Sequence, residues 1–378
     1  MKNKKLVWII LFEDFEVDGR VQRQVQALSD TYDVSVYSVT SKDIRSNYLN
    51  AQFIKIGSKV GFSHSSLIHL IKNLIFAKKN PDAILFNNIY TIPALILLKL
   101  FFRKSKFIYD SHELIVPDPI TKYSIASKKS IFLERIGVKF SDLILCTNEK
   151  RSELMQQYYG LSKAPTSIEN FVDIIPCSED DKKVYKVRGK DKVKFLYQGI
   201  LKDGRYLKEL VDAFVFCELS EFHIYGFGPI ESDLKDLALN HGILNSKVYF
   251  HGKLARDNLY SETIKYDAGL VLYDFSNMNN TYCSPNKTSE YILSGLPILC
   301  TPQESLSDLI EKHGVGECFS RVDLDNNSKL VASTIDKFAK NISCYQLRVN
   351  EAKDEFNFKK QADILRVSLL YLLSEGKV

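Results

Sequence analysis

The chain has 378 residues, of which 45% are hydrophobic and 26% charged, which is typical of a globular protein but too long for a single typical core. Its net charge of +5 is modest, and no recognised DNA- or RNA-binding motif accompanies it, which argues against a nucleic-acid partner. Seven scattered cysteines, never spaced C-x-x-C, argue against a disulfide framework or a zinc site and favour the reducing cytoplasm.

The first apolar segment, LVWIILF at 6–12, follows a basic start in the manner of a signal peptide. It is short, ends in acidic residues and has no small-residue cleavage site, so it predicts a buried strand instead. The most apolar stretch, IPALILLKLFF at 92–102, is interrupted by Lys99 and is too short to span a bilayer. The sequence therefore predicts no membrane-crossing segment.

Short apolar and β-branched runs alternate with segments of helical period along the chain. In the first half the expected strands are 6–12, 32–39, 82–87, 106–111 and 142–148. The pattern restarts later, with expected strands at 192–199, 221–228, 247–252, 268–274 and 296–301. Strands that alternate with helices indicate a parallel sheet with helices on both faces. The sequence thus predicts an α/β protein with two doubly wound, Rossmann-like domains.

The polar and charged segment at 176–192 predicts a linker between these domains. We therefore expect an N-terminal domain over 1–175 and a C-terminal domain over 193–355. Residues 356–378 have the period of an amphipathic helix, which we expect to return to the N-terminal domain. Ligands of open α/β sheets bind beyond the carboxyl ends of the strands, so the two domains are expected to face each other across a cleft.

Positive charge is concentrated early in the chain. Residues 1–170 carry 24 basic and 16 acidic residues, whereas residues 171–378 carry 27 and 30. Several of these cations lie beside large apolar residues or follow shortly after them, namely Lys99, Arg103, Lys104, Lys106, Lys122, Lys128, Lys129, Arg135 and Lys139. Such a mixture suits an anionic membrane surface, where each basic residue contributes about 1 kcal/mol. The alternative is an ordinary solvated helix face.

The segment SPNKTSEYILSGLPILC, at 284–300, predicts a short helix followed by a strand. Ser284 is expected at the N-cap, Pro285 at the first helical position and Gly295 at the end of the helix. One helix face would then carry Asn286, Lys287 and Glu290. By itself this is a well-capped surface helix, but beside a ligand cleft its N-terminus would bind an anion.

Several motifs resemble, in the right order along nearly the whole chain, the retaining GT-B glycosyltransferases of family four. YQGILKDGRYLKELVDAF resembles the start of the family's donor domain, and IYGFGP its second glycine turn. KVYFHGKLARDNLYSETIKYDAGLVLY resembles the stretch beside the nucleotide base, and SPNKTSEYILSGLPIL the nucleotide-sugar segment. In the first half, DGRVQRQVQAL, YDSHEL and IENFVD are similar to the family as well. The resemblance implies a GT-B fold, in which the domain over 1–175 binds the acceptor and the domain over 193–355 binds the nucleotide sugar.

The resemblance also implies roles for individual residues. Arg205 and Lys287 would stabilise the departing diphosphate without a metal, Glu290 would accept the ribose hydroxyls, and His112 would contact the donor sugar. These four are the expected catalytic residues. The expected contacts to the nucleotide sugar are Gly19, Gly199, Gly226, Phe250, Gly252, Ser284, Asn286, Lys287, Thr288 and Glu290.

The chain departs from the family's pattern in two places. The first of two glutamates usual in the nucleotide-sugar segment is replaced by Tyr282, which removes a side-chain contact to the donor sugar. The glycine pair usual after the first strand is missing, and EDFEVDGR stands in its place. In that loop only Gly19 allows a close approach of the backbone. The loop is expected either to favour a different acceptor or to pack against the diphosphate through Arg20.

The function implied is that of a metal-independent, retaining glycosyltransferase of hexosyl or N-acetylhexosaminyl type. It would need no cofactor and would use a UDP-sugar, or as second choice a GDP-sugar. The acceptor would be a glycan or a lipid-linked glycan in surface polysaccharide assembly, at the inner face of the membrane. The alternatives are a GT-B nucleotide-sugar epimerase or sugar-phosphate synthase with a soluble acceptor, and a catalytically silent binding subunit. A nicotinamide enzyme is disfavoured because no G-x-G-x-x-G opens the first helix.

Overall fold

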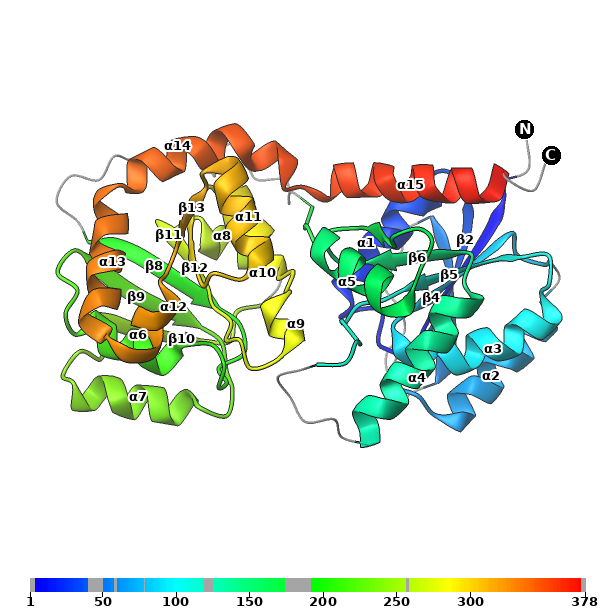
Figure 1. The fold of residues 1–378 in the computed structure, drawn as a ribbon, viewed down its shortest axis with the longest axis horizontal. Coiled ribbons are helices and arrows are strands. Elements are labelled where there is room, and N and C mark those ends of the chain that lie inside the picture. The colour runs from blue at the N-terminus through cyan, green and yellow to red at the C-terminus, as the bar shows by residue number, and fades with distance from the viewer. Residues whose placement is uncertain are drawn as a thin grey trace. The chain divides into compact units, whose positions relative to one another are not determined.

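A computed structural model of the chain describes residues 4–39, 50–57, 60–77, 79–118, 125–173, 192–255 and 258–374 (Figure 1). The chain divides into two compact units. Unit 1 consists of residues 1–170 and 358–378, and unit 2 consists of residues 171–357. The expected linker at 176–192 lies, apart from Lys192, outside the described residues, and so does Lys122.

Unit 1 is built on a seven-stranded parallel sheet whose strand order is β3-β2-β1-β4-β5-β6-β7. Its strands are β1 (Leu6–Leu11), β2 (Asp33–Val39), β3 (Ala51–Gly57), β4 (Ala83–Asn87), β5 (Lys106–Asp110), β6 (Leu143–Cys146) and β7 (Thr166–Ser167). Its helices are α1 (Gly19–Ser29), α2 (His64–Ile75), the 3-10 turn η1 (Ile89–Thr91), α3 (Ile92–Phe101), α4 (Ile125–Phe140), α5 (Glu149–Tyr159) and α15 (Phe358–Ser374).

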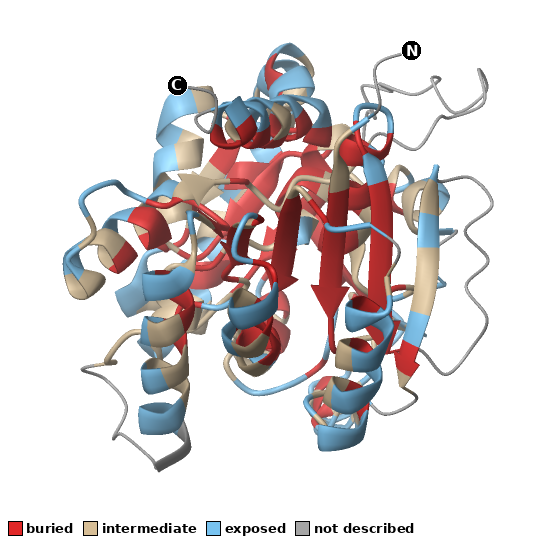
Figure 2. Ribbon diagram, turned by 90° about the vertical axis from the view of Figure 1, so that its right-hand side faces the viewer, coloured by how far each residue is buried: buried red, intermediate tan, exposed pale blue. Residues whose placement is uncertain are grey.

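The central strands of unit 1 form because their apolar runs can be buried on both faces of a parallel sheet. β1 and β4 are almost entirely buried, whereas the edge strand β3 is buried at only one of its seven positions (Figure 2). The strands expected from such runs are confirmed. Sequence reasoning missed β3 and the very short β7, which lack a buried apolar run.

The last helix, α15, packs on α1 within unit 1, although nearly the whole chain separates the two (Figure 1). Phe358, Leu365 and Leu369 join the same buried cluster as residues of β1 and α1. The Arg366 Nε donates a hydrogen bond of 2.7 Å to the Ala27 carbonyl. The sheet of unit 1 is thus covered on this face by the end of the chain.

Unit 2 is built on a six-stranded parallel sheet whose strand order is β10-β9-β8-β11-β12-β13. Its strands are β8 (Val193–Gln198), β9 (Ser220–Tyr225), β10 (Val248–Gly252), β11 (Ala268–Val271), β12 (Ile298–Cys300) and β13 (Gly316–Cys318). Its helices are α6 (Leu207–Phe214), α7 (Glu231–Asn240), α8 (Leu259–Thr263), α9 (Met278–Thr281), α10 (Asn286–Leu293), α11 (Glu304–His313), α12 (Arg321–Asn326), α13 (Ser328–Lys340), α14 (Ile342–Ala352) and η4 (Lys353–Glu355).

Both sheets reverse their winding direction beside their first strand, between β1 and β4 in unit 1 and between β8 and β11 in unit 2. Every pairing in the two sheets is parallel, which confirms two doubly wound, Rossmann-like units. Ligands of such sheets bind at the switch point, beyond the carboxyl ends of the strands. Within the described parts of the chain, no helix is both long and apolar enough to cross a membrane.

Candidate functional site

The candidate site of unit 2 is centred on the N-terminus of α10, which follows β11 and precedes β12. The helix begins at Asn286, and the N-cap is Pro285 rather than the expected Ser284. No side chain caps this end. The Thr288 N–H donates to the Pro285 carbonyl at 3.1 Å, and the earlier N–H groups of the first turn have no partner within the helix. The α10 N-terminus therefore offers these donors and a positive dipole end to an anion. Gly295, at φ 81°, ends the helix as expected, because glycine has no Cβ and adopts the left-handed conformation at little energetic cost.

Two cations converge on one aromatic ring beside this helix end. The Arg205 guanidinium lies 4.0 Å from the Tyr273 ring centroid, and the Lys287 ammonium lies 5.8 Å from the same centroid. Lys287 also lies 4.2 Å from the ring centroid of Tyr197. Among the described residues, neither cation forms an ion pair with a carboxylate. Aromatic faces therefore position two like charges without neutralising them.

The pKa of Lys287 is shifted by its surroundings. Burial and the nearby Arg205 together lower the pKa of its ammonium to about 7, while Glu290 opposes the shift. The part of the shift that comes from Arg205 reflects a local positive field, which favours a negative charge. An anion bound here would restore its charge.

Glu290 lies one helical turn from Lys287 and is held by a residue of the neighbouring strand. Gln198, the last residue of β8, donates from Nε2 to the Glu290 carboxylate at 3.1 Å. The Thr263 hydroxyl lies 3.3 Å from the Gln198 Oε1, although its shorter hydrogen bond, of 2.6 Å, goes to the Leu259 carbonyl. This relay fixes the carboxylate at the switch point, where it can accept hydroxyl groups of a ligand.

Thr288 supplies a further polar atom in the first turn of α10. Its side chain is buried, and its Oγ1 has no hydrogen-bond partner among the described residues. The neighbouring Ser289 is fully occupied, since its hydroxyl donates to the Asn286 carbonyl and accepts from the Val172 N–H. A buried hydroxyl without a partner costs about 1–3 kcal/mol, which a bound ligand could recover.

Two glycine turns bring the backbone close together at the ends of β8 and β9. A Cβ atom on Gly226 would lie 1.9 Å from the Gly199 carbonyl oxygen, so no other residue fits there. Gly199 has a φ of 149°, and a Cβ there would lie 3.2 Å from the Lys287 Nζ. Glycine at both positions lets the two turns pack against each other and lets the Lys287 ammonium approach the backbone of Gly199.

The two contacts expected at the end of β10, Phe250 and Gly252, lie in different surroundings. Gly252 ends the strand at φ 72°, and its carbonyl accepts from the Gly226 N–H at 2.8 Å, which places it at the same edge. Phe250 instead packs its partly buried side chain on the main core cluster of unit 2, with Lys235 over its ring. Its side chain is therefore a core contact.

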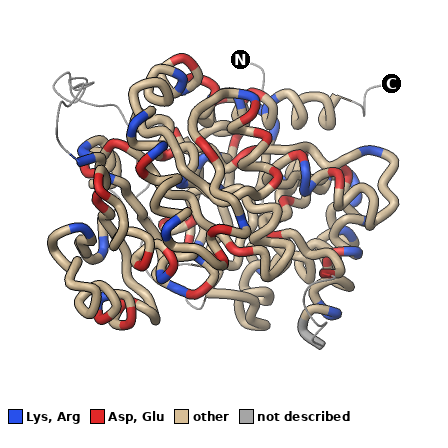
Figure 3. Tube along the Cα trace, turned by 60° about the vertical axis from the view of Figure 1, so that its left-hand side comes forward, with Lys and Arg blue, Asp and Glu red and all other residues tan. Residues whose placement is uncertain are grey.

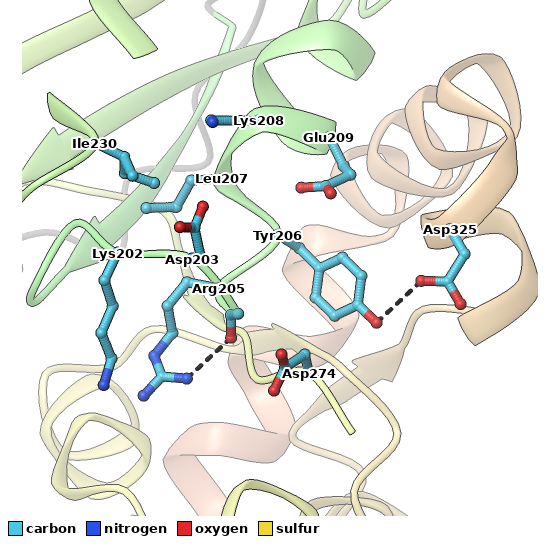
Figure 4. Close-up of a pocket in the computed structure, with 11 residues that line it drawn as sticks. Lys202, Asp203, Arg205, Tyr206, Leu207, Lys208, Glu209, Ile230, Asp274 and Asp325 are labelled. Carbon is cyan, nitrogen blue, oxygen red and sulfur yellow. Dashed lines mark hydrogen bonds between the residues drawn. The ribbon is translucent and has the colours of Figure 1, made fainter. Parts of the chain in front are cut away.

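A pocket of about 260 Å³ adjoins Arg205 (Figure 4). The loop of residues 202–206 forms one wall, and the Tyr206 hydroxyl donates to Asp325 at 3.1 Å. The basic ends of Lys202 and Arg205 point in the same direction in this view. Gly204 is required here, because a Cβ would lie 2.8 Å from the Asp274 carboxylate. The pocket extends the polar site along the start of α6.

In unit 1, the expected residue His112 lies beyond the carboxyl end of β5. Its Nε2 is 3.2 Å from the Asn87 Oδ1 and 3.3 Å from the Asp110 carboxylate, and the side chain is 17% exposed. Burial disfavours the imidazolium, but Asp110 outweighs it and raises the pKa of His112. Gly19 is the first residue of α1, whose N-cap is the Asp18 side chain.

Arg20 is not available for a diphosphate, contrary to the expectation for this loop. Its guanidinium binds Asp110 in a bidentate manner, at 2.8 and 2.7 Å, and donates to the Ile168 carbonyl and the Asn170 side chain. Burial alone would raise the pKa of Asp110, but Arg20 and His112 hold it far below its usual range. The ion pair of Arg20 and Asp110 therefore stabilises the fold of unit 1.

Tyr282, at the position of the usual first glutamate, directs its hydroxyl to Glu304 at 3.4 Å. Sequence reasoning missed Gln198, Tyr273 and Thr263. Tyr273 and Gln198 could have been found, because both stand at the carboxyl ends of predicted strands. No group of three or more metal-ligating side chains occurs in the part of the chain that the structure describes.

Comparison with known proteins places the fold. Residues 227–354 match the family model described as the glucosyltransferase 3-like C-terminal domain. Sucrose-phosphate synthase from Thermosynechococcus elongatus is 12% identical, with 99% of this chain and 100% of that chain covered and a TM-score of 0.74. Anabaena HepE in complex with UDP is 15% identical, with 97% and 100% covered and a TM-score of 0.71. A glycosyltransferase from Rickettsia africae is 14% identical, with 99% of both chains covered and a TM-score of 0.70. No curated protein sequence matches. The fold is therefore GT-B, as expected.

Proposed function

We propose that this protein is a metal-independent, retaining glycosyltransferase that transfers a sugar from a nucleotide-diphosphate sugar. The observation that carries the proposal is the pair of cations at the switch point of unit 2, Arg205 and Lys287. They share one aromatic ring, have no ion-pair partner among the described residues, and stand beside the open N-terminus of α10. A leaving diphosphate requires this kind of preorganised positive field.

The other residues of unit 2 divide the remaining contacts between them. Glu290 accepts both ribose hydroxyls, and the Thr288 hydroxyl together with the first N–H groups of α10 donates to phosphate oxygens. The turns at Gly199 and Gly226 admit the diphosphate to the edge of the sheet. As the sugar leaves, the cations stabilise the growing charge on the phosphate. That phosphate then assists deprotonation of the incoming hydroxyl on the same face of the sugar, which retains the configuration.

His112 contacts the donor sugar in this proposal, because one ring nitrogen is fixed by Asp110 and Asn87. The donor is a UDP-sugar of the hexose or N-acetylhexosamine class, with a GDP-sugar as the second choice. HepE was solved with UDP, which supports the first choice. A thermal-shift panel of UDP, GDP and ADP tests the base, since a ligand at 100 times its dissociation constant stabilises by about 2.7 kcal/mol.

Replacing Glu290 with alanine is expected to weaken the binding of free UDP by about 1.5–3 kcal/mol, because a hydrogen-bonded charged acceptor is lost. Isothermal titration calorimetry measures this effect. Glu231→Ala is the matched control, since Glu231 forms only a surface i,i+4 pair with Lys235. A folded Glu290 variant with the wild-type dissociation constant would remove the ribose role.

The acceptor is proposed to be a glycan or lipid-linked glycan of surface polysaccharide assembly, reached at an anionic membrane. One of the expected cations does not serve this purpose, because Lys99 binds Asp142 and the Phe140 carbonyl. The better surface is one face of α4. It carries four exposed cations and two exposed aromatic rings at helical spacing, namely Lys128, Lys129, Phe132, Arg135, Lys139 and Phe140. Elsewhere along the trace the two signs of charge are interspersed (Figure 3).

Changing the four α4 cations to glutamate is expected to release the protein from anionic liposomes, because each contributes about 1 kcal/mol at such a surface. Co-sedimentation at rising salt measures binding, and UDP affinity should remain unchanged because unit 2 is a separate unit. The control changes Arg103 and Lys104 to glutamate, because these are exposed cations that precede β5. If the wild type does not bind such liposomes at physiological salt, the soluble-acceptor alternative, a sugar-phosphate synthase, gains support.

A further inference from the structure

We propose that Cys300 and Cys318 form a reversible disulfide, and that this oxidation is a modification site that weakens the nucleotide site of unit 2. The two residues are direct partners in the pairing of β12 with β13. Their sulfur atoms lie 3.6 Å apart. Neighbouring strands lie about 4.8 Å apart, which is within the Cα separation that a disulfide spans.

The surroundings of the two thiols differ in a way that assigns their roles. Cys300 is fully buried, whereas Cys318 is partly exposed on β13, the edge strand of the sheet. The Ser307 hydroxyl lies 3.7 Å from the Cys318 sulfur. The hydrogen bond with Cys300 lowers the pKa of Cys318 to about 7, and burial opposes this shift. Cys318 is therefore the thiol that reacts first, and Cys300 is the resolving thiol.

The oxidant is a small hydroperoxide, such as hydrogen peroxide. The Cys318 thiolate attacks one peroxide oxygen and becomes a sulfenic acid, while the O–O bond breaks and the other oxygen leaves as hydroxide. The Cys300 sulfur then attacks the Cys318 sulfur, the S–O bond breaks, and the departing hydroxide takes the Cys300 thiol proton to form water. In total, two thiols lose two electrons and one hydrogen peroxide is reduced to two water molecules.

The other described cysteines lack such a partner geometry. Cys283 is buried in the same apolar cluster as Cys300, but it lies outside the strand pairing that sets Cys300 opposite Cys318. Cys344 is exposed on α14. The pair Cys300 and Cys318 is thus the expected product, and Cys344 is the natural control thiol.

The pair is linked to the nucleotide site through the residue after Cys300. Thr301 accepts at Oγ1 from the Tyr273 N–H at 3.0 Å, and the ring of Tyr273 positions Arg205. Forming the bond closes the sulfur separation by about 1.5 Å, from 3.6 Å to a covalent length. The movement occurs at the end of β12, directly before this hydrogen bond. Oxidation therefore shifts the ring on which the two cations rest.

The chemical test uses the intact protein treated with a small excess of hydrogen peroxide, then blocked with N-ethylmaleimide and digested with trypsin. The disulfide links peptide 288–312 to peptide 313–321, and dithiothreitol separates them. Cys283 lies in a third peptide, 266–287, so its pairing would be recognised separately. We expect the link in the wild type and in Cys344→Ser, and its absence in Cys318→Ser and Cys300→Ala.

Two outcomes would overturn the site: a link from Cys300 to Cys283, or overoxidation of Cys318 while Cys300 remains alkylated. Because Cys318 is partly exposed, its serine variant carries the test even where Cys300→Ala fails to fold. The effect on binding rests on the proposed function. We expect UDP affinity to fall roughly tenfold on oxidation, as shifts of about 1 Å near a substrate cost up to about 10²-fold. Unchanged affinity with the link formed removes the regulatory role alone, whereas a reduced protein that does not bind UDP contradicts the proposed function.

Discussion

Replacing Lys287 or Arg205 with alanine is expected to slow sugar transfer by about 10²–10³-fold, as the loss of other preorganised charge-stabilising donors does. The Tyr273 ring positions each of the two cations separately, so the cation that remains cannot take over the position of the one that is removed. The measurement is turnover with saturating UDP-sugar. In the proposed mechanism these side chains and the α10 amides take the place of a metal, so activity should persist in EDTA.

A matched control for these variants exists in unit 2. Lys329 lies 5.5 Å from the ring centroid of Phe216. Alanine at this position removes a cation stacked on an aromatic ring outside the proposed site and should leave turnover within about twofold, since a surface change is worth about 0.5 kcal/mol or less. Loss of activity in EDTA, with recovery on adding magnesium or manganese, would refute the metal-free mechanism.

The affinity for UDP is expected to fall as the pH rises from 7 to 9. Lys287 has a pKa of about 7 in the free protein, and a bound diphosphate stabilises its charged form, so its pKa rises in the complex. Binding above pH 7 must therefore take up a proton, and affinity falls by up to about tenfold per pH unit until the pKa of the complex is reached. Calorimetry in buffers of different ionisation enthalpy counts the proton. Lys287→Ala should abolish the uptake.

Replacing Arg20 with alanine is expected to lower the free energy of unfolding by about 3–5 kcal/mol, because it leaves the buried Asp110 carboxylate without its bidentate partner. Chemical denaturation of the intact protein measures the loss. Arg348→Ala is the control, since Arg348 forms only an exposed pair with Glu351 and should change stability by about 0.5 kcal/mol or less. A stable Arg20→Ala protein with weakened UDP binding would indicate instead that Arg20 contributes to nucleotide binding.

The strand pattern could be predicted from the sequence because buried parallel strands are continuous apolar runs, as in β1 and β4. The strands that escaped prediction, β3, β7 and β13, are short or only partly buried and show no such run. The expected start of α10 was wrong by one residue because Ser284 and Pro285 each suit a helix start, and local preferences do not decide between them.

The candidate site could be predicted only where its residues form local motifs. Lys287, Thr288 and Glu290 stand on one short helix, and Arg205 follows a recognisable glycine turn. Tyr273, which positions both cations, lies 68 positions after Arg205, and no periodicity connects the two. The role of Arg20 was also hidden, since its partners Asp110 and Ile168 are 90 and 148 positions away. Such long-range contacts depend on the order of the strands in the sheet, which cannot be read from local sequence patterns.

Because α15 belongs to unit 1, that unit cannot complete its core until the last residues of the chain have been synthesised. The ribosome completes all 170 N-terminal residues of unit 1 long before Phe358, Leu365 and Leu369 exist to close their shared core. At about 5–20 residues per second, the intervening residues 171–357 take roughly 10–40 s to translate. During that interval the surface of α1 that receives α15 remains uncovered on the nascent chain. A chaperone that binds apolar surfaces would find its target there, and unit 2 can fold to completion first although it is made second.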